Sequence, residues 1–192
     1  MKNLIIVFFV LLIFSCKNKA NEENVNDIIS LMIDKKAFPL PPPPAINDTI
    51  TTVISKRVRD SLLQVKLKVA LYPTLYDFSS DEIKAIIPKQ YKGIIEMQGI
   101  NSEKNKLDKL LFTEKGHEIM LADTTQIKKS RDFENFDLLF WFSNFYYSKD
   151  KEKVFFGLGI SRSKLDSNGV LYILKKENSK WQIEYSEVSD LW

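Results

Sequence analysis

The feature that most constrains the fold is a concentration of aromatic and apolar residues in the C-terminal third of the chain. Most of the aromatic side chains lie between Phe133 and Trp192. Residues 138–147 are apolar at odd and even positions alike, which is typical of a strand covered on both faces. In residues 154–161, large side chains alternate with a mostly small set. This small set predicts close approach by another element; its members are Phe155, Gly157, Gly159 and Ser161.

Turn signals divide the rest of this region into further strands. Residues 148–153 form a charged turn, and residues 166–169 (Asp-Ser-Asn-Gly) and 178–179 (Asn-Ser) predict two more turns. A strand at residues 170–174 therefore precedes a final strand, and four successive antiparallel strands make an aromatic-rich meander. The final strand is expected to bury one face only, that of Trp181, Ile183 and Tyr185.

The residues of these turns and strands carry a resemblance. The charged turn at 149–153 and the ending from Tyr172 to Ile183 resemble the C-terminal sheets of uncharacterised bacterial envelope proteins. A lysine-asparagine turn that leads into Trp-x-Ile also looks like the closing strands of NTF2-like and cystatin-like folds. The resemblance covers only this part of the chain and consists of packing and turn residues. It implies a sheet, and no functional residue can be carried over from it.

The N-terminal half predicts helices joined by a stiff spacer. A helix is expected at residues 25–36 and a second at residues 48–63, because apolar residues recur at helical spacing in both. Between them lies the proline-rich segment 38–44, which must be an extended polyproline stretch. We interpret this segment as a spacer across the domain surface. The alternative is a ligand for an aromatic groove on a partner.

The middle of the chain predicts shorter elements. A capping box of Ser79 and Glu82 opens a helix that ends near Ile87, because Pro88 disfavours helical geometry in the preceding residue. Residues 123–135 are polar, and their pattern predicts neither a helix nor a strand. Strands are expected at residues 65–71, 93–98, 110–113 and 117–121, the last two forming a hairpin.

The N-terminus predicts export. Met1, Lys2 and Asn3 precede an unbroken apolar run from Leu4 to Phe14. A basic start and a short apolar run are typical of a secretory signal peptide. A helix of this run would rise only about 16 Å, too little to cross a hydrocarbon core of about 30 Å. We therefore interpret the run as an export signal.

The residues at the end of this run are similar to a lipobox. Ile13, Phe14, Ser15 and Cys16 place an apolar residue at −3, a small residue at −1 and the only cysteine of the chain at +1. The resemblance to bacterial lipoprotein precursors implies cleavage between Ser15 and Cys16 and lipid attachment to Cys16. It predicts a lipid-anchored protein of the bacterial cell envelope, in the outer membrane on its periplasmic or surface face. One acyl chain holds a protein at a membrane only marginally, so stable anchoring takes two signals. The several acyl chains that the resemblance implies would exceed this requirement.

Composition fits one exported domain. Residues 1–15 are the expected signal peptide, residues 16–24 a lipidated flexible tether, and residues 25–192 a single domain that includes the proline-rich spacer. The formal net charge of +3 on 192 residues is too small to argue for nucleic acid. With no second cysteine, stability must come from packing and backbone pairing.

No motif assembles a catalytic, metal or cofactor site. His117 is the only histidine, lacks a second histidine at the spacing of a zinc helix, and is expected at the surface beside a glycine turn. Gly157 and Gly159 lack the third glycine of a dinucleotide fingerprint and lie within a predicted strand. Residues 166–169 lack the acidic end of a calcium loop. A hydrolytic site made of two carboxylates across a cleft stays an open alternative, although the spacing of the Asp and Glu residues singles out no such pair.

These observations predict an α+β domain in which a mostly antiparallel sheet, ending in the aromatic meander, packs against N-terminal helices. The leading functional hypothesis is a non-enzymatic envelope lipoprotein that binds an envelope protein or a small ligand, without a cofactor. The alternative is a hydrolase that acts on envelope polymers through carboxylates. The aromatic surplus could form a platform that stacks sugar rings or peptide side chains, but its alternation favours a place in the core.

Overall fold

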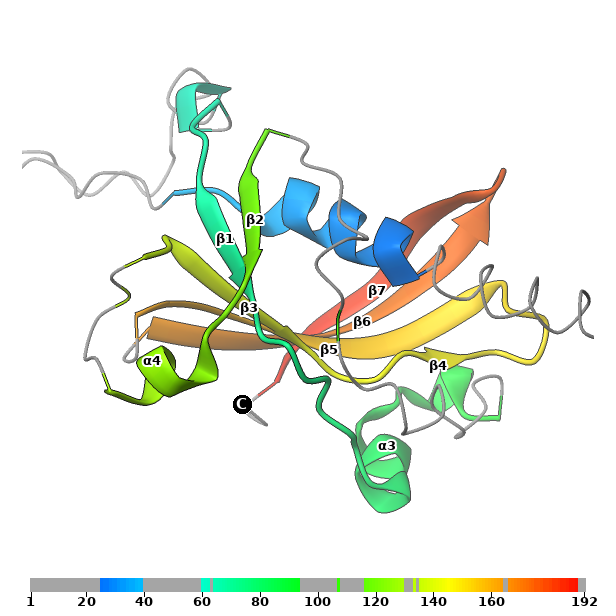
Figure 1. Cartoon of the computed structure of the whole chain (residues 1–192). Coiled ribbons are helices and arrows are strands. Elements are labelled where there is room, and N and C mark those ends of the chain that lie inside the picture. The colour runs from blue at the N-terminus through cyan, green and yellow to red at the C-terminus, as the bar shows by residue number, and fades with distance from the viewer. Residues whose placement is uncertain are drawn as a thin grey trace, which may run out of the picture.

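The computed structural model of the chain describes residues 25–39, 60–62, 64–93, 107, 116–129, 133, 135–163 and 166–189. Most of this part is one mixed sheet of seven strands (Figure 1). A helix at residues 25–36 precedes it, and residues 60–62 are also helical. Further helices are α3 (Ser80–Ile86), α4 (Thr124–Lys129) and the 3-10 turn η1 (Lys89–Tyr91). The strands are β1 (Lys68–Leu71), β2 (Glu118–Leu121), β3 (Leu138–Phe142), β4 (Tyr146–Tyr147), β5 (Lys153–Ser163), β6 (Asp166–Glu177) and β7 (Lys180–Ser189).

The sheet has a parallel half and an antiparallel half. The strand order is β2-β1-β3-β5-β6-β7, and β4 pairs with β5. β1 runs parallel to both β2 and β3, whereas β3, β5, β6 and β7 pair antiparallel in succession. The prediction of a mostly antiparallel, aromatic-rich sheet is confirmed. The described chain is nearly all sheet, however, so the α+β class overstated the helices; the long hairpins of β5, β6 and β7 dominate it.

One face of the sheet carries the main core. The helix at residues 25–36 lies across this face (Figure 1). It buries Ile28, Ile29 and Met32 completely, and they pack against the side chains of β3, β5 and β6. Burying each such side chain contributes about 1.5–3 kcal/mol. The predicted helical stripe is therefore confirmed. Fully buried aromatic rings on this face come from Phe140, Phe142, Phe145, Phe156 and Tyr172.

The opposite face is covered in two places. α3 and η1 cover one end through a cluster that includes Ile83, Ile87 and Phe155. α4 covers the other end, where Ile127 packs against a cluster that includes Leu139. Figure 1 shows both short helices on the side of the sheet away from the helix at residues 25–36. A strip of this face between α3 and α4 carries the hollow described below.

The predicted continuous strand at residues 138–147 is wrong, because it is divided into β3 and β4. Phe142 pairs with Leu158, but Tyr146 pairs with Phe155, so the register advances by one residue across the break. The hydroxyl of Ser143 accepts a hydrogen bond from the Gly157 N–H at 2.7 Å and so satisfies the backbone there. The extra residue turns Tyr146 toward the α3 side of the sheet.

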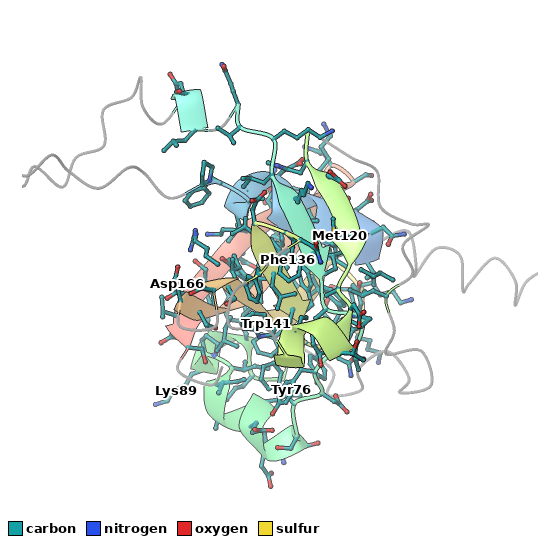
Figure 2. The ribbon with its side chains drawn as sticks, turned by 60° about the vertical axis from the view of Figure 1, so that its left-hand side comes forward. Tyr76, Lys89, Met120, Phe136, Trp141 and Asp166 are labelled. Atoms are coloured by element: carbon teal, nitrogen blue, oxygen red, sulfur yellow. The ribbon has the colours of Figure 1, made fainter. Side chains whose placement is uncertain are left out.

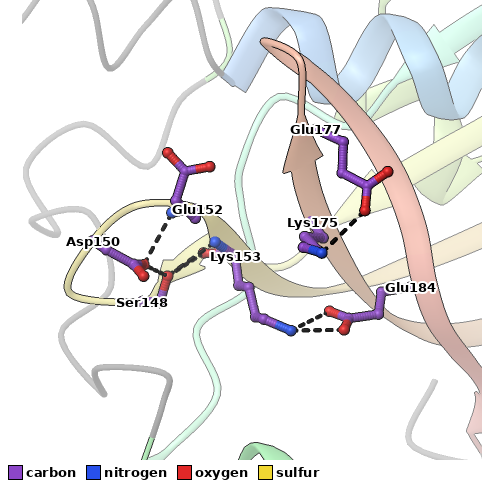
Figure 3. Close-up of polar contacts among 7 residues, drawn as sticks. All are labelled: Ser148, Asp150, Glu152, Lys153, Lys175, Glu177 and Glu184. Atoms are coloured by element: carbon purple, nitrogen blue, oxygen red, sulfur yellow. Dashed lines mark hydrogen bonds and ion pairs between the residues drawn. The ribbon is translucent and has the colours of Figure 1, made fainter.

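A bulge in β7 corrects the prediction that the last strand buries a single face. Ile183 pairs with Leu174 and Tyr185 pairs with Ile173, which leaves Glu184 as an extra residue. The bulge therefore places Ile183 on the face of the helix at residues 25–36 and Tyr185 on the α3 face. Glu184 accepts hydrogen bonds from the Lys153 Nζ at 2.5 and 2.7 Å (Figure 3).

The predicted turns have mixed outcomes. The charged turn before β5 is confirmed, and the Asp150 carboxylate accepts from the Ser148 hydroxyl at 2.6 Å (Figure 3). The turn at residues 178–179 is confirmed, with both residues at positive φ. The turn predicted at residues 166–169 is wrong: these residues begin β6, and Gly169 pairs with Gly159. Cross-strand pairing with β5 outweighs the turn preference of the Asn-Gly sequence.

The shorter elements also differ in outcome. β1 lies within the strand predicted at 65–71, and α3 has the predicted capping box and ends before Pro88. α4 was not predicted; its signal is Asp123, whose Oδ1 accepts from the Thr125 N–H at 2.9 Å. β2 pairs in parallel with β1. The strand predicted at 93–98 lies outside the described residues except for Gly93, which is in a turn. Of the helix predicted at 48–63, residues 60–62 are described and are helical. The first hairpin strand at 110–113 and most of the proline-rich spacer also lie outside the described residues.

Candidate functional site

A hollow of about 380 Å³ lies at the carboxyl ends of the parallel strands β1 and β3. Its floor is apolar and buried, with Leu75, Leu139 and Phe142 each at most 9% exposed. Its accessible walls are the aromatic side chains of Tyr72, Tyr76 and Trp141, with Thr74 at the mouth. We call it the Trp141 hollow, and none of the described residues in its lining is charged.

Gly159 makes room for the indole that defines the hollow. Trp141 on β3 pairs with Gly159 on β5. A Cβ placed at Gly159 would overlap the Cε2, Nε1 and Cζ2 atoms of the Trp141 indole. The indole therefore lies directly on the β5 backbone at Gly159. This confirms the prediction that another group closely approaches the small face of this strand.

Backbone hydrogen bonds hold the two tyrosines along β3. The Tyr72 N–H donates to the Phe140 carbonyl at 2.8 Å, and the Tyr76 N–H donates to the Phe142 carbonyl at 3.0 Å. The Tyr76 carbonyl accepts from the Asn144 N–H at 2.7 Å. The segment after β1 thus continues beside β3. Figure 2 shows Tyr76 and Trp141 on the same side of the molecule, with Phe136 beyond Trp141.

A polar cluster fixes the Tyr76 end of the hollow. The Oδ1 atom of Asp77 accepts from the Tyr146 hydroxyl at 2.7 Å and from the Asn144 Nδ2 at 2.9 Å. The Tyr146 hydroxyl accepts in turn from the Phe78 N–H at 2.9 Å. Burial, followed by the hydrogen bond to Asp77, raises the pKa of the Tyr146 phenol. Tyr146 therefore stays neutral and ties the loop after Tyr76 to β4.

Glu82 borders Tyr76 on the other side. Its Oε1 atom lies 3.4 Å from the Tyr76 hydroxyl, which donates to it, while its Oε2 accepts from the Ser79 N–H at 2.7 Å. Hydrogen bonding to the side chain and then the backbone of Ser79 lowers the pKa of Glu82. A general acid at neutral pH needs a raised carboxyl pKa. Glu82 therefore suits the role of a fixed negative charge at the start of α3 and does not suit that of a proton donor.

Two further hollows in the described chain have charged side chains in their linings. One of about 500 Å³ lies between α3 and β7, with Lys89, Lys92 and Glu187 in its wall. One of about 340 Å³ lies beside Arg162 and Asp137. The Trp141 hollow differs from both because none of the described residues that line it is charged. Apolar lining with a few polar groups is typical of small-molecule sites.

The residues that the sequence singled out lie elsewhere or outside the described chain. Ser15 and Cys16 are outside it. The prediction of a surface His117 is wrong: the side chain is 9% exposed, and its Nδ1 accepts from the Leu67 N–H at 3.2 Å. His117 thus caps the amino ends of β1 and β2, the opposite end from the hollow. Among the described residues, no group of three or more His, Cys, Asp or Glu could hold a metal ion.

The aromatic residues divide between core and surface. The expectation that most are core is confirmed for seven fully buried rings: Phe140, Phe142, Phe145, Tyr146, Phe155, Phe156 and Tyr172. Trp141 and Tyr72 are half-buried, and Tyr76 is 46% exposed. Sequence reasoning placed Trp141 in the core and did not single out Tyr72 or Tyr76. Gly159 was the one residue by which sequence reasoning pointed to this site.

Comparison with known proteins gives no relative. No protein-family model, no curated protein and no solved structure matches the chain. In the described part, no helix is both long enough and apolar enough to span a membrane.

Proposed function

We propose that the protein is a lipid-anchored lipoprotein of the bacterial cell envelope whose domain is a non-enzymatic binding module. The anchor is supported by the sequence from Met1 to Cys16, which combines an export signal with a lipobox-like end. Cys16 would carry the lipid, and cleavage would follow Ser15. The domain would then bind a small ligand or a protein side chain while it stays at the membrane.

Cys16→Ser is expected to abolish lipid attachment. The variant should move from the membrane to the soluble fraction, or accumulate with its signal peptide uncleaved, because the hydroxyl cannot replace the sulfur in the attachment reaction. Fractionation and mass spectrometry of the N-terminus measure both outcomes. The matched control is Ser15→Ala, which keeps a small residue at −1 and should be processed and anchored normally. Normal cleavage and membrane partition of Cys16→Ser would refute the anchor.

The binding role is carried by the Trp141 hollow. A volume of about 380 Å³ is large enough for a small molecule or one large side chain. Tyr76 and Trp141 line the hollow and supply aromatic surface for stacking. The Gly159 contact holds the indole in place before any ligand arrives, which reduces the ordering that binding requires.

Binding can be tested with neutral probes. Benzyl alcohol, which mimics an aromatic side chain, is expected to give saturation-transfer signals and to shift the Trp141 indole resonance in NMR spectra. Trp141→Ala should reduce its affinity by at least about tenfold, because a buried aromatic contact contributes about 1.5 kcal/mol or more. Cellobiose, tested in parallel, distinguishes sugar-ring stacking from side-chain binding.

The control for this test is Val188→Ala, at a side chain that is 75% exposed outside the Trp141 hollow. It should bind both probes as the unaltered protein does. If neither probe binds, or if Trp141→Ala binds equally well, the hollow is not the binding surface.

A further inference from the structure

Among the described residues, the charged groups nearest Tyr76 at its end of the Trp141 hollow are the carboxylates of Asp77 and Glu82. Asp77 follows Tyr76 directly, and Glu82 accepts a hydrogen bond from the Tyr76 hydroxyl. Lys84, the basic residue in the last turn of α3, is paired with Asp81 at 3.6 Å. The hollow thus combines an uncharged aromatic wall with carboxylates at one end.

The tyrosines at this end respond to a negative electrostatic potential. Burial raises the pKa of Tyr76, and the charges of Glu82 and Asp77 raise it further because they oppose formation of the phenolate. The charges of Asp77 and Glu82 also raise the pKa of the Tyr146 phenol. A potential that disfavours an anion at this place favours a cation.

Aromatic faces next to carboxylates match the chemistry of an ammonium group. The faces of Trp and Tyr rings attract cations, and quaternary ammonium groups are bound in proteins by such rings. Tyr72, Tyr76 and Trp141 supply these faces, and Leu75 and Leu139 offer contact to apolar carbon. A neutral ligand would gain from the rings and would gain nothing from Asp77 and Glu82.

We propose that the Trp141 hollow binds an organic cation, an ammonium group carried on a small apolar body. The proposal rests on the proposed binding function and names its ligand class. The apolar body lies against Leu139 and Trp141, and the ammonium group lies at the Tyr76 end, within the field of the two carboxylates.

The test compares two probes of the same shape on the full chain in detergent. Choline carries the charge, and dimethylbutanol is its neutral isostere, in which carbon replaces nitrogen. Choline is expected to bind at least about fivefold more tightly than dimethylbutanol, the effect of a partly screened charge pair. The shift of the Trp141 indole resonance reports both affinities. A higher salt concentration should reduce the difference between the affinities for choline and dimethylbutanol, because salt screens the carboxylates.

Glu82→Gln separates charge from shape. Glutamine can still complete the capping box of α3, so the fold should be kept, and the loss of a negative charge from the first turn should lower the thermal midpoint only slightly. Choline affinity should fall about threefold to tenfold, with dimethylbutanol affinity unchanged. Asp150→Asn, which removes a carboxylate from the turn before β5, is the matched control and should change neither affinity.

The outcomes distinguish failure of cation recognition from failure of the proposed binding function of the hollow. Equal binding of choline and dimethylbutanol would overturn cation recognition and would leave the hollow as a site for neutral ligands. Failure of both probes would also overturn the cation proposal, and the benzyl alcohol titration would then judge the binding function by itself. An effect of Asp150→Asn equal to that of Glu82→Gln would show that general protein charge, not the rim of the hollow, attracts the cation.

Discussion

Gly159→Ala is expected to displace the Trp141 indole from the sheet. The new methyl group would occupy the space of the Cε2, Nε1 and Cζ2 atoms, and the strand backbone on which Gly159 lies is held by β3 and β6 on its two sides. Overpacking of this kind costs about 1–3 kcal/mol in the free energy of unfolding. Urea denaturation measures this loss, and the Trp141 indole resonance should shift to that of an exposed ring. Binding of benzyl alcohol should be lost as well.

A double-mutant cycle with Trp141→Ala is the control for this prediction. Without the indole, the methyl group meets free space, and alanine in place of glycine should then be neutral or stabilising by up to about 1 kcal/mol. The coupling free energy between positions 141 and 159 should therefore account for most of the loss. An equal loss in both backgrounds would show that the glycine is required for another reason.

Phe156→Ala is expected to cause the largest loss of stability in the core. Phe156 is fully buried, and its ring centroid lies 5.2 Å from that of Phe145, 5.6 Å from Tyr172 and 6.1 Å from Phe142. Truncation of a buried phenylalanine costs about 3–5 kcal/mol, a large part of the 5–15 kcal/mol that stabilises a typical domain. The free energy of unfolding in urea measures this loss.

The matched control is Phe38→Ala, because that ring is 37% exposed. Its loss should stay within about 1 kcal/mol. Phe156→Leu, which keeps most of the apolar volume, should fall between the two. A loss of less than about 1 kcal/mol for Phe156→Ala would contradict the assignment of the aromatic rings to the main core.

Local patterns predicted the elements whose residues interact with near neighbours in the chain. The stripe of residues 25–36 predicted its helix, and Ser79 with Glu82 predicted the start of α3, since a capping box joins residues only three apart. The turn at 178–179 followed from its residue types. α4 was missed because a single aspartate before two threonines is a weak signal without its packing partners.

The candidate site was predictable only in part. Gly159 indicated close approach to β5, but the group that approaches is Trp141, which belongs to a different strand. Tyr72 and Tyr76 reach the hollow because the segment after β1 runs beside β3. Strands this far apart in the sequence meet only through sheet pairing, which no local pattern encodes.

The sequence by itself determined that the chain forms an aromatic-rich, mostly antiparallel sheet with a helix at residues 25–36, because alternation and helical spacing follow from how each element buries its apolar side chains. Only the tertiary structure decided the parallel pairing of β1 with β2 and β3 and the faces that the side chains take. The break after Phe142 and the bulge at Glu184 each add one residue to a strand. One added residue exchanges the two faces of everything that follows, because the side-chain period of a strand is two.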